Sequence, residues 1–153
     1  MSEPGTNQEA GDFTDRMLVE LARDARKAAY PPYSGFTVGA ACKAESGITY
    51  FGCNVENSSY PVGICAERAA VAGAIAHGEK GIVTLAIAGG GKDSRPDGEI
   101  RPCGMCLQFL SEFMAPSGRI LIADDVEGWV ETTLGELLPH AFNMKTDRVE
   151  KEP

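Results

Sequence analysis

Residues 82–88 read Ile-Val-Thr-Leu-Ala-Ile-Ala, a nearly continuous apolar run. A run of this length and composition is typical of a strand that is buried on both faces of a sheet, because such a strand has no polar face to present to water. We therefore expect residues 82–88 to form a central strand, with the rest of the chain organised around it.

Helical and extended patterns alternate on both sides of this strand. Apolar residues at helical spacing begin at Phe13, and Pro31-Pro32 ends that helix. The further predicted elements, in chain order, are strands at 36–44 and 48–55 joined by a Ser46-Gly47 turn, a helix at 65–77, a glycine-rich loop at 89–101, a helix at 103–114, strands at 119–123 and 129–133, and a short helix at 134–142. This alternation predicts a layered α/β sandwich.

The chain of 153 residues is long enough for one domain with a hydrophobic core. We expect a catalytic domain at 13–142, a flexible N-terminal tail at 1–12 and a charged C-terminal tail at 143–153. No apolar run reaches the roughly 18 residues that a membrane helix needs. No basic and apolar leader pattern opens the chain, so a cytoplasmic location is the expectation.

The charge balance is acidic, with 22 Asp and Glu residues against 14 Lys and Arg residues. Proteins that bind nucleic acids gain much of their affinity by neutralising phosphates with Lys and Arg. Because no basic run occurs here, we expect neither a nucleic acid nor a membrane as partner. A small neutral ligand fits the composition better.

For the five cysteines, the candidate roles are metal binding, catalysis or simple burial rather than disulfides. Their odd number, in a chain without secretory features, argues against a disulfide framework. Two of them form the segment Pro102-Cys103-Gly104-Met105-Cys106 at a predicted helix start, which places both thiols on one face about one turn apart. Alone, this spacing also fits a thioredoxin-like redox pair.

Cys65 changes the balance between these alternatives, because it too lies at a predicted helix start. If both helices begin at the same edge of the sheet, three thiols converge. Three thiolates leave one position of a tetrahedral zinc open, whereas structural zinc sites usually fill all four with protein ligands. Glu67, two residues after Cys65, then lies beside the metal without ligating it, as a general acid/base requires. The pattern therefore favours hydrolysis over scaffolding.

Other candidate residues have simpler interpretations. Cys42 and Cys53 fall in predicted strands and are expected to be ordinary buried residues. His77 and His140 fall at helix ends, where capping or surface roles are commoner than metal ligation. The run Gly89–Gly91 lacks the Lys-Ser or Lys-Thr ending of a phosphate loop.

At the zinc motif, the sequence resembles the cytidine deaminase family, whose signature is a His or Cys, one residue, Glu, and later Pro-Cys-x-x-Cys. The resemblance extends to Tyr30–Ala41, to Asn54–Tyr60 and to Leu137–Phe142. It implies a three-layer α/β/α sandwich around a mixed five-stranded sheet. The Asn-Val-Glu-Asn segment and the first ligand Cys65, where polynucleotide-editing and tRNA-editing relatives typically have His, resemble the enzymes that act on free nucleosides.

The resemblance also implies roles for individual residues. Zn²⁺ would be held by Cys65, Cys103 and Cys106, and Glu67 would move protons from the attacking water to N3 and then to the leaving amine. The implied substrate contacts are Phe36 against the pyrimidine, Asn54 and Glu56 on the ribose 3′-hydroxyl, Ala66 at the polar edge of the base, Phe142 closing the pocket and Tyr60 reaching an adjoining subunit's site. Arg68 would donate to the ligand sulfurs and offset their charge. A homotetramer is implied.

One position departs from the family pattern. Leu107-Gln108 follows Cys106, where the family commonly has Arg-Gln. The local support of that helix, or a subunit contact, therefore differs from the family pattern.

The functional hypothesis from the sequence is hydrolytic deamination of cytidine, deoxycytidine or both in pyrimidine salvage. The alternatives are deamination of a modified cytidine or another aminopyrimidine nucleoside, and a structural zinc module that binds a partner.

Overall fold

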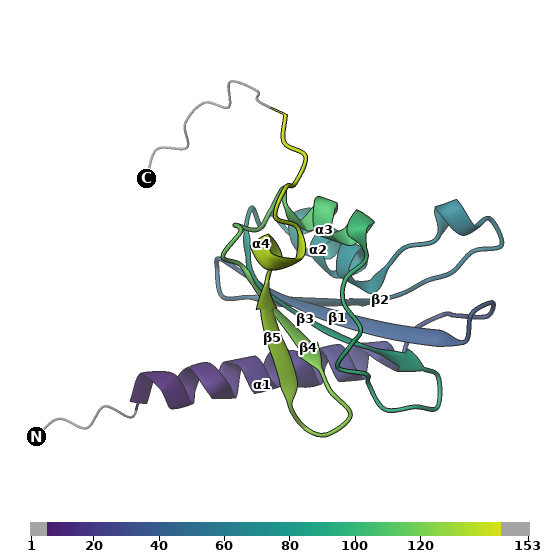
Figure 1. Ribbon diagram of the computed structural model, residues 1–153, viewed down its shortest axis with the longest axis horizontal. Coiled ribbons are helices and arrows are strands. Elements are labelled where there is room, and N and C mark those ends of the chain that lie inside the picture. Colours follow the sequence, from purple (N-terminus) through teal and green to yellow (C-terminus); the bar gives the residue numbers. More distant parts are fainter. Residues whose placement is uncertain (1–5, 145–153) are drawn as a thin grey trace, which may run out of the picture.

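The computed structural model describes residues 6–144. Helices pack on both faces of a five-stranded sheet, which gives three layers (Figure 1). The elements are α1 (Thr6–Arg26), β1 (Phe36–Ala44), β2 (Thr49–Cys53), the short 3₁₀ helix η1 (Tyr60–Val62), α2 (Ala66–Ala76), β3 (Ile82–Gly91), α3 (Gly104–Leu110), β4 (Arg119–Ala123), β5 (Trp129–Thr133) and α4 (Leu134–Leu137).

The sheet is mixed and has the strand order β2-β1-β3-β4-β5. Only β3 and β4 pair in parallel, and the other neighbours are antiparallel. The central position of β3 confirms the interpretation of its apolar sequence, since Leu85 to Ala88 are fully or almost fully buried. The predicted α/β sandwich is therefore confirmed.

The two faces of the sheet differ in the size of their side chains. The face under α1 carries small residues, among them Ala41, Ala86 and Ala88, which lets the helix lie close. The opposite face carries larger residues, such as Leu85, Ile87 and Ile120, and packs against α2, α3 and α4. Figure 1 shows α1 alone on one side and the three other helices together on the other.

Two glycines allow the helices this close approach. A Cβ on Gly39 would overlap the backbone of Ala22 and Arg26 in α1. A Cβ on Gly52 would lie 2.6 Å from the Ala70 backbone nitrogen of α2. Since backbone atoms cannot swing aside as a flexible side chain can, these positions fix how near both helices lie to the sheet.

Arg26, the last residue of α1, fastens the helix to the sheet. Its Nε donates to the carbonyl and hydroxyl oxygens of Thr37 in β1. Its Nη1 donates to the carbonyl of Ser94, and its Nη2 to the carbonyl of Gly91. The guanidinium thus joins α1, the start of β1 and the loop after β3.

The structure differs from the sequence expectations at several element ends. Helix α1 begins at Thr6 rather than Phe13, because Gln8, Glu9 and Ala10 favour helix although they add no apolar stripe that would reveal it. Residues 1–5 of the expected N-terminal tail and 145–153 of the C-terminal tail lie outside the described residues. The assignment of 13–142 to one catalytic domain stays a prediction.

The expected loop at 89–101 is wrong at its start. Gly89, Gly90 and Gly91 continue β3 and pair with Val38, Thr37 and Phe36. The neighbouring strand supplies the hydrogen bonds that override the low strand propensity of glycine. Helices α3 and α4 end at Leu110 and Leu137, earlier than the apolar pattern indicated.

A pair of glycine substitutions tests the packing of α1 against the sheet. Gly39→Ala should lower the free energy of unfolding by about 2 kcal/mol or more, because helix and sheet must separate to admit the methyl group. Gly73→Ala in α2, where no atom lies within 4 Å of the new Cβ, should instead raise it by about 0.5–1 kcal/mol. Urea unfolding of the zinc-loaded protein measures both, and equal effects would contradict the packing model.

Candidate metal centre and active site

Three cysteine thiols meet where α2 and α3 begin. Cys65 is the N-cap residue of α2, Cys103 is the N-cap residue of α3, and Cys106 lies one turn into α3. The Sγ atoms of Cys65 and Cys103 are 4.0 Å apart, and those of Cys103 and Cys106 are 3.5 Å apart. All three sulfurs lie within 4.8 Å of one another.

These distances fit a single zinc ion. Zn–S bonds of about 2.3 Å in a tetrahedral arrangement place thiolates roughly 3.8 Å apart. Within residues 6–144, this is the one group of three or more potential ligands close enough to share a metal, and it contains no fourth protein ligand. A zinc ion held by these residues would therefore keep one position open, as catalytic sites do.

The pKa values of Cys65 and Cys106 shift in opposite directions. The hydrogen bond from Cys106 lowers the pKa of Cys65 to about 5, and Arg68 acts in the same direction. The same hydrogen bond and burial raise the pKa of Cys106. Of these two thiols, Cys65 is the more acidic, and the thiolate is the form that binds metal.

Arg68 extends from the first turn of α2 toward the sulfurs. Its Nη2 lies 3.9 Å from Sγ of Cys65. Burial opposes the charge of the guanidinium, but the thiols of Cys65 and Cys106 outweigh it and raise the pKa of Arg68. A permanent cation here offsets the excess negative charge of three thiolates around one Zn²⁺.

Glu67 lies beside the thiol cluster in the first turn of α2, and only 4% of the residue is exposed. Burial raises its pKa to about 7, and the negative charge of Cys65 adds to that rise. A carboxyl group that titrates near neutrality next to a metal site can both accept and donate a proton.

A cavity of about 440 Å³ opens in front of the cluster. Its lining includes Cys65, Arg68 and Cys103 on the metal side and Asn54, Glu56 and Tyr60 on the other. The volume lies in the range of small-molecule sites. Besides two of the thiols, the cavity lining therefore includes four other residues that the sequence analysis predicts for the site: Asn54, Glu56, Tyr60 and Arg68.

Two residues of the predicted sugar-binding segment are held by backbone groups. One carboxylate oxygen of Glu56 accepts hydrogen bonds from the N–H groups of Tyr33 and Ser34, both 3.1 Å long. These bonds, that of Ser34 first, hold the pKa of Glu56 below its usual range. The Asn54 amide accepts from the Val38 N–H and donates to the Phe36 carbonyl, which ties the segment to β1.

The remaining predicted contacts lie elsewhere in the single chain. Phe36 at the start of β1, the fully buried Ala66 and Phe142 do not line this cavity. Glu67 and Cys106 are also outside its lining and lie buried behind Cys65 and Cys103. Phe142 is 71% exposed and pairs through its backbone N–H and carbonyl with the Gln108 amide of α3. Tyr60 lines the cavity of its own chain and meets Tyr33 edge-on, with 5.7 Å between ring centroids.

Sequence reasoning missed several features of the site. The two amides that hold Glu56 belong to Tyr33 and Ser34 and carry no side-chain signal. The only pointer was the turn chemistry of Pro31-Pro32 and of Gly35, whose φ is 66°. Met105, 65% exposed between two metal ligands, also lines the cavity. His77 is the C-cap residue of α2 and contacts the Tyr50 ring.

An α/β sandwich with three thiols and a buried Glu at the starts of two helices defines a zinc-dependent deaminase. Residues 13–121 match the family model described as the cytidine and deoxycytidylate deaminase zinc-binding region. The chain belongs to this family.

Individual relatives agree along most of the chain. The cytidine deaminase of Sporosarcina psychrophila is 40% identical over 129 residues, which cover 82% of this chain and 89% of that protein. The crystal structure of cytidine deaminase from Burkholderia pseudomallei is 38% identical, with a TM-score of 0.74, covering 82% of this chain and 97% of that one. The Mycobacterium tuberculosis cytidine deaminase structure is 38% identical, with a TM-score of 0.70 and coverage of 84% and 96%.

Metal content tests the ligand set. The purified protein should hold about one zinc per chain, and Cys103→Ala should lose most of it because two thiolates bind zinc far more weakly. Cys103 is exposed, so the substitution leaves the core intact. Cys53→Ala, a cysteine outside the cluster, is the matched control. Elemental analysis after dialysis measures both, and full zinc content in Cys103→Ala would rule out the three-thiol site.

Proposed function

We propose that the chain catalyses the hydrolysis of cytidine and 2′-deoxycytidine to uridine and deoxyuridine with release of ammonia, a step of pyrimidine salvage. The observation that carries this proposal is the buried Glu67 beside three clustered thiols, two of which, Cys65 and Cys103, line a cavity that Glu56 also lines. The named activity of the relatives supports the same reaction.

The chemistry follows from the position of each group. Cys65, Cys103 and Cys106 would hold the zinc ion, which when bound would lower the pKa of a water molecule and make it a nucleophile at neutral pH. Glu67 takes a proton from the water that attacks C4 of the pyrimidine and delivers it to N3. It then carries the second proton of that water to the amino group, which leaves as ammonia. Arg68 keeps the thiolate cluster from becoming too negative.

Substrate recognition falls to the opposite wall of the cavity. Glu56 is ionised, and the backbone of Tyr33 and Ser34 fixes one of its oxygens, which leaves the other to accept from a ribose hydroxyl. The Asn54 amide, itself fixed by β1, retains one N–H for the same sugar. We further propose that Phe36 and Ala66 contact the base and that Phe142 closes the pocket.

We also propose that the working form is a homotetramer in which the Tyr60 region contributes to a neighbouring site. Tyr60, Val62, Met105 and Phe142 are each at least 65% exposed. Tyr60 and Met105 line the cavity, so a second copy of the chain that packs there would bury apolar surface and close the site.

None of the helices described between residues 6 and 144 could cross a bilayer. Three thiols that must stay reduced fit the reducing cytoplasm.

Glu67→Gln tests the catalytic role directly. Because the amide has the same shape but cannot carry protons, kcat for cytidine should fall about 10²–10⁴-fold while zinc content stays unchanged. Glu45→Gln, an exposed substitution in the turn after β1, should behave as the wild type. Loss of cytidine absorbance reports turnover, and near-normal activity of Glu67→Gln would refute the assignment.

Glu56→Gln tests the sugar contact and the substrate class together. Loss of a charged hydrogen bond to the ribose should raise KM for cytidine about 10–100-fold. The low turnover expected for free cytosine, which has no sugar, should not change. Ser58→Ala, in the same loop but outside the cavity lining, is the control. A panel of cytidine, deoxycytidine, cytosine and modified cytidines separates the proposed activity from deamination of another aminopyrimidine; an unchanged KM would contradict the role of Glu56.

A further inference from the structure

A second and larger cavity, of about 650 Å³, lies between the end of α1 and the loop after β3. It shares no lining residue with the cavity at the thiol cluster. Five cationic side chains line it, against the single carboxylate of Asp93: they are Arg23, Arg26, Lys27, Lys92 and Arg95. In a chain with a net charge of −8, this local excess of positive charge runs against the overall balance.

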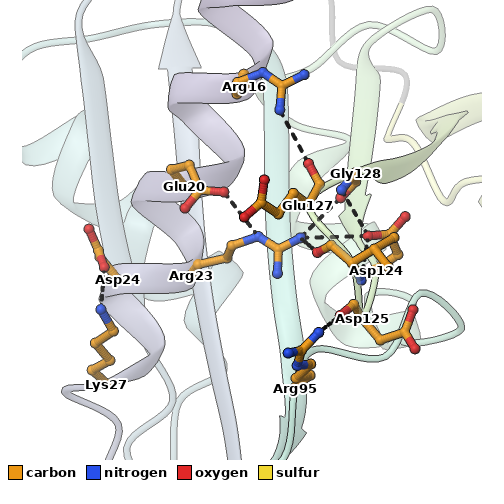
Figure 2. A network of polar contacts seen from close by, with 11 residues as sticks. Arg16, Glu20, Arg23, Asp24, Lys27, Arg95, Asp124, Asp125, Glu127 and Gly128 are labelled. Carbon is orange, nitrogen blue, oxygen red and sulfur yellow. Dashed lines mark hydrogen bonds and ion pairs between the residues drawn. The ribbon is translucent and has the colours of Figure 1, made fainter.

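Two of the five cations are already neutralised. Arg23 lies between Glu20 of α1 and Asp124 of the loop before β5, and it also donates to the carbonyls of Val126 and Gly128 (Figure 2). Lys27 pairs with Asp24 on the exposed side of the helix. Arg23 holds α1 against the loop before β5, whereas the Lys27–Asp24 pair is local to the end of α1. Both pairs leave little charge for a ligand.

The other three cations have no carboxylate partner within the part of the chain that the structure describes. Arg95 donates only to the carbonyl of Asp125. Arg26 is just 9% exposed, and its acceptors are carbonyl and hydroxyl oxygens. Lys92 forms no ion pair and lies beside them in the same lining.

Arg26 is the centre of this arrangement. All the acceptors of Arg26 are neutral oxygens, so no carboxylate compensates its positive charge. In agreement with this, burial and the charge of Arg23 lower the pKa of Arg26. Its bonds to Thr37, Ser94 and Gly91 use three of the five guanidinium N–H groups, so two remain. A buried cation without a counter-ion is costly, and an anion in the cavity would remove that cost.

The remaining wall of the cavity suits an organic group. Ala29, Tyr30, Pro31 and Pro32 form it, and the Tyr30 side chain is exposed enough to contact a ring. We propose that this cavity binds a phosphorylated small molecule, whose phosphate lies between Arg26, Lys92 and Arg95 and whose organic part lies on the Tyr30–Pro32 wall.

Calorimetric titration of the zinc-loaded chain with pyrophosphate and with uridine triphosphate tests the site. Both titrations are run at constant ionic strength with saturating uridine, so that the thiol-side cavity does not contribute, and zinc content is checked afterwards. We expect saturable binding in the micromolar to submillimolar range. The measurement needs no deaminase activity, so it stands or fails separately from the proposed function.

The variants use the two exposed cations, because Arg26→Gln could loosen α1. The double substitution Lys92→Gln with Arg95→Gln should weaken pyrophosphate binding at least 10-fold. Lys80→Gln with Arg101→Gln removes the same charge outside the cavity and should weaken it less than 2-fold. Absence of saturable binding would overturn the proposed site. Equal weakening in both double variants would overturn it as well, because the loss of affinity would then follow from the change in net charge and not from the cavity.

Discussion

The position of three sulfur atoms is the constraint on which the rest of the structure depends. Zinc requires thiolates roughly 3.8 Å apart, and here they come from two helices that are separated along the chain by the whole of β3. Both helices must therefore start at the same edge of the sheet and lie on the same face. Gly52 contributes by admitting the α2 backbone, because any side chain there would push Cys65 away from Cys103.

The pKa values of the two glutamates of the site shift in opposite directions because their environments differ. Glu56 is exposed to the cavity and accepts two backbone N–H groups, which lower its pKa and keep it a permanent acceptor. Glu67 is buried beside thiols, and burial raises its pKa to about 7, which suits proton transfer. Such opposite shifts in neighbouring carboxyl groups separate binding from acid/base chemistry.

The sequence predicted the strands at 36–44, 119–123 and 129–133, because apolar periodicity is a local signal. The spacing of Cys103 and Cys106 is local too, but their convergence with Cys65 depends on the fold and was predicted through the family signature. It did not predict that Gly89–Gly91 form a strand, since that depends on pairing with a distant segment. Nor did it reveal the backbone amides that hold Glu56 or the backbone of Phe142 that pairs with the Gln108 side chain, because backbone groups leave no trace in residue identity.

Helices usually begin with Ser, Thr, Asp or Asn, whose side chain accepts a first-turn N–H. Helix α4 follows this rule through Thr133 and Glu136. Helices α2 and α3 instead begin with Cys65 and Cys103, and neither side chain caps its helix. The positions that usually cap a helix are used here for two potential metal ligands. A zinc ion held by them would therefore connect the starts of two helices that β3 separates along the chain.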